Sequence, residues 1–288
     1  MPSASTMVLG VIGCPVAHSL SPAMHGAAIG ALELDAVYLA FHVEPANLRE
    51  AVSGMRALGM RGLNATIPHK DALLPLMDEL DDSAVSAGCV NTITNRCGTL
   101  VGSSTDGPGF LRSLGEAGVA VDGARVVLAG SGGSARSVAS ALGPRVASLH
   151  IAARNEAARR GLAAGLAARG VAVTCGGLSE GELSSALDGA AALVNTTPLG
   201  MWPHTDGCIP VDCRSLRADL LVVDIVYNPS PTRLLRRASL AGCRTVDGVG
   251  MLVHQGAIAL ELWTGLPAPV AVMRAALKEG LRARSAGE

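Results

Sequence analysis

The chain of 288 residues has few aromatic side chains and no run of basic residues. Aromatic residues make up 2% of it, and its two tryptophans and two tyrosines offer little surface on which bases could stack. The formal net charge at pH 7 is -1, so no positive surface is expected to follow a phosphate backbone. We therefore expect no nucleic-acid partner.

Long apolar runs are also missing. The first charged residue after the amino terminus is Glu33, but Pro15, His18 and other polar residues or prolines interrupt the stretch before it. No span of about 20 apolar residues remains to cross a membrane, and the basic start of a signal peptide is absent. We therefore expect a cytoplasmic protein without a membrane partner.

Patterns typical of metal sites and disulfide frameworks are absent as well. The seven cysteines are odd in number and scattered, without a CxxC pair or a spacing of cysteine and histidine that suits a metal. They are interpreted as reduced, buried thiols. His18 and His25 lie near the start of the chain, but nothing in the pattern places them on a shared ion. No metal is expected.

Apolar residues make up 49% of the chain, which also has 35 glycines. This composition indicates a globular protein with many tight turns. Apolar strands alternate with helical patterns, and this alternation predicts parallel sheets. Strands are expected at 8–12, 36–43, 62–67, 90–94, 100–104, 126–129, 149–152, 171–174, 192–194, 220–226 and 244–246, with a hairpin between 90–94 and 100–104. Helices are expected at 22–32, 47–58, 69–80, 109–114, 251–263 and 269–284.

The predicted fold class is α/β with two domains, because the length suits two modest cores. We expect an N-terminal α/β domain with a mainly parallel sheet over 1–106 and a Rossmann-like dinucleotide-binding domain over 107–246. Helices in 247–288 are expected to return to the first domain.

The most informative motif is the turn Gly130-Ser131-Gly132-Gly133-Ser134-Ala135, which follows an apolar strand. Gly130 allows the tight turn, Gly132 lets the backbone approach a pyrophosphate, and Ala135 lets the next helix pack closely. The motif predicts a bound dinucleotide.

Arg154 follows the second strand of the dinucleotide-binding domain, which is the first strand after this turn, at the place where an acidic residue would bind the ribose of NAD. An arginine there suits the 2′-phosphate of NADP, with Arg159 or Arg160 assisting. A solvated arginine at the start of a helix is the alternative interpretation.

Three polar segments precede the glycine turn. Ser19 and Ser21 flank a helix start, where they either cap the helix or bind a carboxylate. Asn64 and Thr66 lie on one face of a strand, and the expected helix after Pro68 places Lys70 in its first turn, an unusual position for a cation. Lys70 is either a surface lysine or, paired with Asp106, a group that moves a proton during hydride transfer. Asp106 itself also suits a helix cap before Pro108.

These residues together resemble the shikimate/quinate dehydrogenase family over nearly the whole chain. The matching segments, in order, are Ser19-Leu20-Ser21-Pro22, Asn64-x-Thr66-x-Pro68-x-Lys70, Val90-Asn91-Thr92, Thr105-Asp106-Gly107, the GSGGSA turn, Asn195-Thr196-Thr197, Asp224 to Tyr227, and Asp247-Gly248-x-Gly250-Met251-Leu252-x-x-Gln255.

The resemblance implies an enzyme of the chorismate pathway of aromatic amino acid biosynthesis. It implies that Lys70 and Asp106 assist proton transfer at the substrate 3-oxygen while hydride passes between C3 and the nicotinamide. The implied substrate ligands are Ser19, Ser21, Asn64, Thr66, Asn91, Tyr227 and Gln255. The implied cofactor-binding residues are Gly130, Gly132, Gly133, Ser134, Ala135, Arg154, Thr197, Ile225 and Gly248.

Two departures from the family pattern stand out. Ser104 replaces the asparagine that usually precedes Thr-Asp-Gly, so the hydrogen bonds that orient Asp106 are expected to differ. Ala153 and Asn155 flank Arg154 in place of the usual asparagine and threonine, which is expected to weaken the preference for NADP.

The sequence thus predicts an NADP-dependent oxidoreductase that interconverts 3-dehydroshikimate and shikimate, a small carboxylate, as a monomer or homodimer. A quinate or aminoshikimate dehydrogenase that uses NAD or NADP is an alternative. Another is a regulator that binds NADP or a metabolite without catalysis, although the Lys70 and Asp106 pair argues against it.

Overall fold

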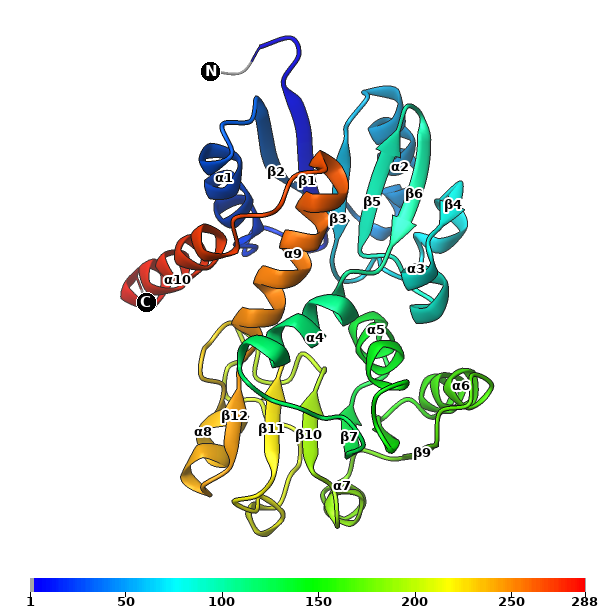
Figure 1. Cartoon of the computed structure of the whole chain (residues 1–288), viewed down its shortest axis with the longest axis vertical. Helices are drawn as coiled ribbons and strands as arrows, with labels where there is room; N and C mark the ends of the chain where they lie inside the picture. The colour runs from blue at the N-terminus through cyan, green and yellow to red at the C-terminus, as the bar shows by residue number, and fades with distance from the viewer. Residues whose placement is uncertain (1–2, 288) are drawn as a thin grey trace. The chain divides into compact units, whose positions relative to one another are not determined.

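The computed structural model describes residues 3–287, with side chains as far as 284. The described residues form two compact units, one of residues 3–109 and 253–287, the other of Phe110–Leu252. The chain passes from one unit to the other within α4 (Asp106–Glu116) and again within α9 (Gly248–Thr264) (Figure 1). The C-terminal helical segment therefore belongs to the same unit as the N-terminal half.

The first unit is built on a six-stranded sheet with the order β2-β1-β3-β5-β6-β4. Its strands are β1 (Met7–Gly13), β2 (Ala36–His42), β3 (Gly62–Ala65), β4 (Glu79–Leu80), β5 (Thr92–Arg96) and β6 (Thr99–Ser103). Strands β2, β1 and β3 run parallel, whereas β5 pairs antiparallel with β3 and with β6. The sheet is therefore mixed, and the expected hairpin is confirmed as β5 and β6.

Helices α1 (Ser21–Ala31), α2 (Leu48–Ala57), α3 (Asp82–Ala87) and α10 (Val270–Gly287) complete this unit, with short 3-10 turns at Pro45–Asn47 and Leu74–Leu76. Helix α10 packs against α1 (Figure 1). Trp263 of α9 is 1% exposed and lies directly over Gly62 of β3, where any side chain would collide with the indole. Its Nε1 donates to the Ile93 carbonyl at 3.0 Å. Gly62 thus allows the returning helix to seat on the sheet.

The second unit is a doubly wound parallel sheet with the order β12-β11-β10-β7-β8-β9. Its elements are β7 (Arg125–Ala129), α5 (Gly133–Leu142), β8 (Ser148–Ala152), α6 (Glu156–Ala167), β9 (Val173–Gly176), α7 (Glu180–Leu187), β10 (Ala192–Asn195), a 3-10 turn at Cys213–Ser215, β11 (Leu221–Asp224), α8 (Arg233–Leu240) and β12 (Arg244–Val246). Alternate side chains of β7 enter apolar clusters on opposite faces. This strand order is that of a dinucleotide-binding Rossmann sheet.

One expected element is wrong. The segment 69–80 contains only turns, the 3-10 turn Leu74–Leu76 and the short strand β4 (Glu79–Leu80). Pro75 stands in its middle, where a helix would need the N–H that proline lacks. Lys70 therefore lies in a turn and not in the first turn of a helix.

Helix α3 (Asp82–Ala87) is an element that the sequence analysis did not expect. The Asp81 carboxylate caps it by accepting from the Ala84 N–H at 3.0 Å, and Gly88 ends it with a left-handed φ of 60°. Both features are ordinary helix boundaries that were visible in the sequence.

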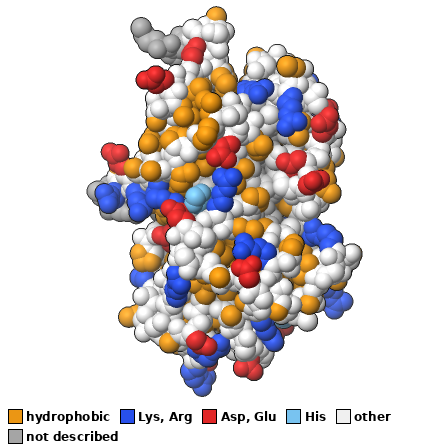
Figure 2. Space-filling model, in the orientation of Figure 1, with side chains coloured by type: hydrophobic (Ala, Val, Ile, Leu, Met, Phe, Trp, Pro, Cys, Tyr) orange, Lys and Arg blue, Asp and Glu red, His pale blue; other side chains and the backbone are white. Residues whose placement is uncertain are grey.

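All seven cysteines are free thiols, as expected. Cys89 and Cys243 are buried, as expected. Cys97 and Cys213 are exposed, so the expectation of buried thiols is wrong for those two, and Cys14, Cys175 and Cys208 are only half-buried. Across residues 3–287, no helix combines the length and apolar character that crossing a membrane requires. Charged side chains of both signs are interspersed on the face drawn in Figure 2.

Candidate functional site

The first unit brings Lys70 and Asp106 into direct contact. Lys70 Nζ lies 2.5 Å from Asp106 Oδ2, and the two side chains are 14% and 7% exposed. Asp106 opens α4 just after β6, while Lys70 lies in the turn that follows β3, so the pair joins segments that are 36 positions apart. A lysine held this close to a carboxylate, and reachable by solvent, can exchange protons with a bound substrate.

Asn91 positions the other oxygen of this carboxylate. Its Nδ2 donates to Asp106 Oδ1 at 2.8 Å and to Thr105 Oγ1 at 3.0 Å. Its Oδ1 accepts from the Thr105 N–H at 2.8 Å and from Thr92 Oγ1 at 3.1 Å. Asn91 is 2% exposed, and such a buried amide fixes the groups around it because each unmade hydrogen bond is costly.

Asn64 of β3 extends the network to Tyr38 of β2. Its Nδ2 donates to Thr92 Oγ1 at 3.0 Å, and its Oδ1 accepts from the Tyr38 hydroxyl at 2.8 Å. Burial raises the pKa of Tyr38, whose hydroxyl also interacts with Ser21. Side chains from β2, β3 and β5 and the first residue of α1 therefore form one connected set of polar groups.

The two serines at α1 do not act as helix caps. Leu20 occupies the cap position without a side-chain hydrogen bond, and Ser21 is the first helical residue. Ser19 Oγ instead accepts from the Ser21 N–H at 3.2 Å. Thr66 lies beside Gly13, where a Cβ would come within 2.5 Å of the Thr66 methyl carbon. The Thr66 hydroxyl has no hydrogen-bond partner among residues 3–287 and is available to a ligand.

Gln255 of α9 reaches the same network. Its Oε1 lies 3.4 Å from Asn91 Nδ2 and 3.4 Å from Thr105 Oγ1. The close approach depends on Gly109 of α4, because a Cβ there would stand 2.6 Å from the Gln255 backbone nitrogen. Six of the seven predicted substrate ligands and both predicted catalytic residues thus belong to this unit: Ser19, Ser21, Asn64, Thr66, Asn91, Gln255, Lys70 and Asp106.

The glycine turn of the second unit has the geometry that a pyrophosphate needs. Gly130 has a φ of +123°, and a Cβ there would collide with Thr196 Oγ1, which donates to the Ala129 carbonyl at 2.6 Å. Gly132 precedes α5 with an extended backbone, and nothing lies within 4 Å of where its Cβ would be. Gly130 therefore closes the turn, while Gly132 keeps a helix N-terminus open to an anion.

Three more predicted cofactor residues start α5. Gly133 and Ser134 are its first residues, and Ala135 is fully buried against the sheet. These positions present backbone N–H groups at the positive end of the helix dipole.

Thr197 is held by a buried network at the ends of β10 and β11. Its hydroxyl donates to Asn195 Oδ1 at 2.7 Å, and Asn195 Nδ2 donates to Asp224 Oδ1 at 2.9 Å. Burial raises the pKa of Asp224 to about 6, although hydrogen bonds from Thr232, Val226 and Asn195 oppose the rise.

Ile225 and Gly248 meet in the second unit, since a Cβ on Gly248 would collide with the Ile225 carbonyl oxygen. Tyr227 is half-buried in the segment after β11, also in the second unit. Arg154 is exposed just after β8 and has no hydrogen-bond or ion-pair partner within residues 3–287. Its guanidinium is therefore available to an anion.

The two departures from the family pattern have local explanations. The Ser104 hydroxyl lies 3.7 Å from Cys89 Sγ, and Asp106 is oriented by Asn91 and Lys70 instead. The Ala153 carbonyl accepts from Arg159 Nη1 at 3.0 Å, and the Asn155 side chain caps α6.

The sequence analysis missed Tyr38 and Thr92 as members of this network. Thr92 is fully buried and joins Asn64 to Asn91. Its place beside Asn91 in the matching segment was a usable indication. Nothing in the sequence indicated Tyr38, because its contact with Asn64 crosses the intervening strand β1.

Comparisons with known proteins agree with this geometry. Residues 11–93 match a family model described as the shikimate dehydrogenase substrate binding domain, and residues 248–278 match one described as the shikimate 5'-dehydrogenase C-terminal domain. The shikimate dehydrogenase (NADP(+)) of Moorella thermoacetica is 46% identical over 286 residues, which cover 99% of this chain and 97% of the relative.

Solved structures give the same result. A crystal structure of a shikimate dehydrogenase in complex with NADP+ has 39% identity and a TM-score of 0.91, and the match covers 98% of each chain. A quinate dehydrogenase from Corynebacterium glutamicum in complex with NAD has 34% identity and a TM-score of 0.86, covering 95% of this chain and 99% of that one. With relatives this similar over nearly its whole length, the chain belongs to the shikimate dehydrogenase family.

Proposed function

We propose that this protein is an NADP-dependent oxidoreductase that interconverts 3-dehydroshikimate and shikimate. The contact between Lys70 and Asp106, held in place by Asn91, carries the proposal. Reducing a ketone to an alcohol requires one hydride and one proton, and a bound nicotinamide supplies only the hydride. We place the protein in the cytoplasm, as a monomer or a homodimer.

The residues of the first unit supply the proton. In the direction of reduction, the Lys70 ammonium donates a proton to the 3-oxygen as negative charge develops there, and the alcohol forms. Asp106 Oδ2, 2.5 Å from Lys70 Nζ, holds the ammonium in position, and Asn91 fixes the carboxylate in turn. In the direction of oxidation, the same lysine takes the hydroxyl proton back.

The polar groups around the pair suit a hydroxylated ring with one carboxylate. Asn64 and Gln255 offer amide groups, and the Thr66 hydroxyl is without a partner among the described residues. Ser19 and Ser21 lie at the N-terminus of the eleven-residue helix α1, whose positive end favours a carboxylate. We assign the substrate carboxylate to these serines and the ring hydroxyls to the other three residues, with Tyr227 as a further ligand.

The second unit fits NADP. The open position at Gly132 and the N-terminus of α5 suit the pyrophosphate, with Gly130, Gly133, Ser134 and Ala135 forming the turn. Arg154 suits the 2′-phosphate because its guanidinium is exposed and without a partner within residues 3–287. We assign Thr197, Ile225 and Gly248 to the rest of the cofactor.

Replacing Lys70 tests the proposal, and the chain offers a matched control because Lys70 and Lys278 are its two lysines. Lys70→Ala should lower kcat for shikimate oxidation by ~100-fold or more, since proton transfer contributes about that much. The Kd for NADP+ should stay unchanged in both variants, and Lys278→Ala should keep the parent kcat. Equal turnover in the Lys70→Ala variant and the parent would remove Lys70 from the chemistry.

The similarity to a quinate dehydrogenase that was solved with NAD gives a second candidate reaction. Measuring kcat/KM for shikimate and quinate with NADP+ and NAD+ separates the two. A higher kcat/KM for quinate than for shikimate would assign the chain to quinate oxidation.

A further inference from the structure

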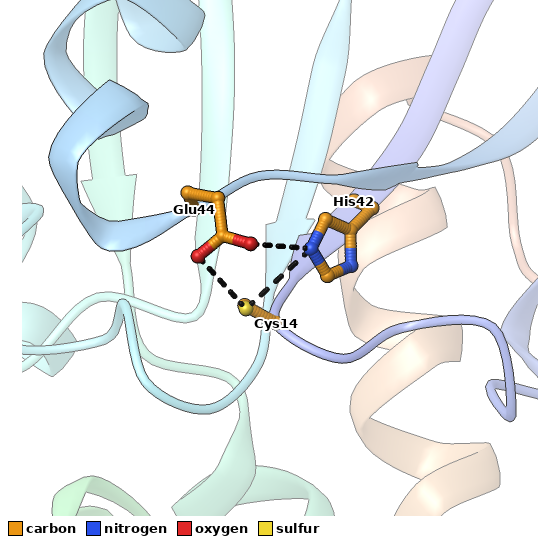
Figure 3. Close-up of side chains that lie close together, drawn as sticks. All are labelled: Cys14, His42 and Glu44. Carbon is orange, nitrogen blue, oxygen red and sulfur yellow. Dashed lines mark hydrogen bonds and ion pairs between the residues drawn. The ribbon is translucent and has the colours of Figure 1, made fainter.

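Three side chains that the proposed reaction does not use meet where β1 and β2 end (Figure 3). Gly13 and His42 are the last residues of these parallel strands and are partners in the register. Cys14 directly follows Gly13, and Glu44 lies two residues beyond His42. Cys14 Sγ is 3.6 Å from His42 Nε2 and 3.6 Å from Glu44 Oε2, and His42 Nε2 is 3.1 Å from Glu44 Oε1.

These spacings are close to those of donors around one zinc ion. Tetrahedral zinc holds a sulfur at ~2.3 Å and a nitrogen or oxygen at ~2.0 Å. Sulfur therefore lies ~3.5 Å from the other two donors, and nitrogen and oxygen lie ~3.3 Å apart. The sulfur-to-nitrogen separation agrees with this arrangement to about 0.1 Å. Glu44 meets the sulfur with Oε2 and the nitrogen with Oε1, so one carboxylate oxygen must shift to bind an ion beside both, and one donor atom from each residue already lies within 4.8 Å of the others.

The backbone holds the three residues in place without a metal. The Cys14 N–H donates to the Ile67 carbonyl at 3.1 Å, and the Val43 N–H donates to the Gly13 carbonyl at 3.1 Å. The buried His69 ring bonds the Val43 carbonyl at 2.8 Å, which fixes the short segment between His42 and Glu44. A site that is already ordered loses little conformational entropy when an ion binds.

The surroundings also leave room for a fourth ligand. The His42 and Glu44 side chains are 53% and 60% exposed, so water can reach the cluster. The Cys14 thiol donates to Glu44 Oε2, so it carries its proton in this arrangement. Because zinc binds the thiolate, an ion at this site must displace that proton.

We propose that Cys14, His42 and Glu44 bind Zn²⁺, with water as the fourth ligand. Thiolate, imidazole and carboxylate are the three donor types that zinc uses in proteins, and three protein ligands with one water form an open site. The ion connects the end of β2 to the start of the segment that carries Ser19 and Ser21. Zinc binding at this place needs neither substrate nor cofactor, so it can be tested independently of the proposed reaction.

Cobalt titration of the full-length protein, after treatment with a chelator, tests the site. Co²⁺ should bind with a stoichiometry of one and produce a thiolate-to-cobalt charge-transfer band in the near ultraviolet, and Zn²⁺ should remove the band by displacement. Cys14→Ser should abolish the band, and His42→Ala should weaken zinc binding by ~10-fold or more. Binding at pH 7 should release about one proton, measured by calorimetry in two buffers.

Cys97→Ser is the matched control, because Cys97 is an exposed cysteine of the same unit. This variant should keep the band and the zinc affinity of the parent. Three results would each overturn the proposal: no charge-transfer band in the parent, a band that persists in Cys14→Ser, or a band that is lost in Cys97→Ser. If Cys14→Ser does not fold, as judged by circular dichroism, unchanged zinc affinity in His42→Ala is the result that decides against the site.

Discussion

The three arginines that follow β8 differ in what holds their guanidinium groups. Arg159 Nη1 donates to the Ala153 carbonyl, and Arg160 pairs with Glu156 at 2.7 Å one helical turn away. Arg154 alone of the three has no partner within the described residues. This difference makes Arg154 the first choice for binding the 2′-phosphate of NADP, with the other two engaged elsewhere.

Replacing Arg154 should therefore change the choice of cofactor. Charge-assisted hydrogen bonds contribute about 1.5–3 kcal/mol, so Arg154→Ala should raise the Kd for NADP+ by ~10-fold or more. NAD+ lacks the 2′-phosphate, and its Kd should stay within about twofold of the parent's. Fluorescence titration with both nucleotides measures this, with Arg160→Ala as the matched control. Parallel changes for NADP+ and NAD+ would show that Arg154 does not read the phosphate.

At the scale of single residues, the sequence could predict the members of the polar network that belong to linear motifs. Asn64, Lys70 and Asp106 are such residues, and the structure brings all three into one unit. It could not predict Tyr38, because that contact depends on strand register. The cluster of Cys14 and His42 was missed for the same reason, since 28 positions separate them until β1 and β2 pair.

At the scale of elements, the turn between β7 and α5 contains two glycines that are needed for different reasons. Gly130 is required by the fold, because its φ of +123° and the nearby Thr196 hydroxyl exclude a side chain. Gly132 is not required by the fold, since its backbone is extended and the space beside it is empty of protein atoms. Under the proposed cofactor assignment, the pyrophosphate is what requires Gly132 to lack a side chain.

The two glycine-to-alanine variants should accordingly behave differently. Gly132→Ala should keep the free energy of unfolding within about 0.5 kcal/mol of the parent, because nothing in the protein meets the new methyl group. It should nevertheless raise the Kd for NADP+ by ~10-fold or more, since the methyl group occupies the path of the pyrophosphate. Gly130→Ala should cost about 1–3 kcal/mol of stability through backbone strain. Urea unfolding without ligand and a nucleotide titration measure both quantities.

Parent-like binding of NADP+ by Gly132→Ala would contradict the assignment of this turn to the pyrophosphate. A parent-like free energy of unfolding for Gly130→Ala would contradict the steric argument about Thr196. The two predictions are independent, so a wrong prediction for one variant leaves the test of the other unchanged.

The hydrophobic periodicity of the sequence predicts some elements correctly and others wrongly. Strand β12 (Arg244–Val246) begins and ends where the sequence predicts, whereas 69–80 reads as a helix and is not one. The spacing of apolar residues there predicts a helix, but Pro75 removes a hydrogen bond in the middle of the segment. The segment instead presents Asp78, whose carboxylate accepts from the Leu100 N–H at 2.7 Å and pairs with Arg56. Such long-range partners are not visible in a local pattern.

At the scale of the whole molecule, two buried groups in different units make stability depend on pH with opposite signs. His25 is fully buried, its ring is stacked on Tyr38 at 4.1 Å, and its two ring nitrogens have no hydrogen-bond partner among residues 3–287. Burial lowers the pKa of His25 to about 3. Burial raises the pKa of Asp224 to about 6.

The signs follow from which state binds the proton. Between pH 6.5 and pH 3 the unfolded chain protonates His25 and the folded chain does not, so stability is lost as the pH falls below 6.5. Between pH 3.8 and pH 6 the folded chain keeps a proton on Asp224 that the unfolded chain releases, so this contribution is lost as the pH rises through 6. Between pH 7.5 and pH 5, His25 should lower the free energy of unfolding by about 2 kcal/mol, and Asp224 should raise it by about 1 kcal/mol.

Replacing His25 should remove its part of the stability that the protein loses in acid. His25→Met has a similar volume and loses no hydrogen bond within the described residues, so its free energy of unfolding should fall by about 2 kcal/mol less than the parent's between pH 7.5 and pH 5. Trp263 lies 5.8 Å from His25 in the first unit, and Trp202 is the chain's other tryptophan. Urea unfolding followed by fluorescence in a Trp202→Phe background therefore reports on the unit that contains His25.

Asp224→Asn should change the pH dependence of the second unit in the opposite direction, because it removes a group that gains stability in acid. The fluorescence of Trp202, which lies in that unit, reports on its unfolding when Trp202 is kept. Comparing each variant with the parent at both pH values cancels the contributions of the surface carboxylates, which are the same in all three proteins. A His25→Met variant that loses as much stability as the parent at pH 5 would mean that the imidazole is already protonated in the folded protein. The stacking against Tyr38 would then have to accommodate a buried charge, which apolar surroundings without a hydrogen-bond acceptor disfavour.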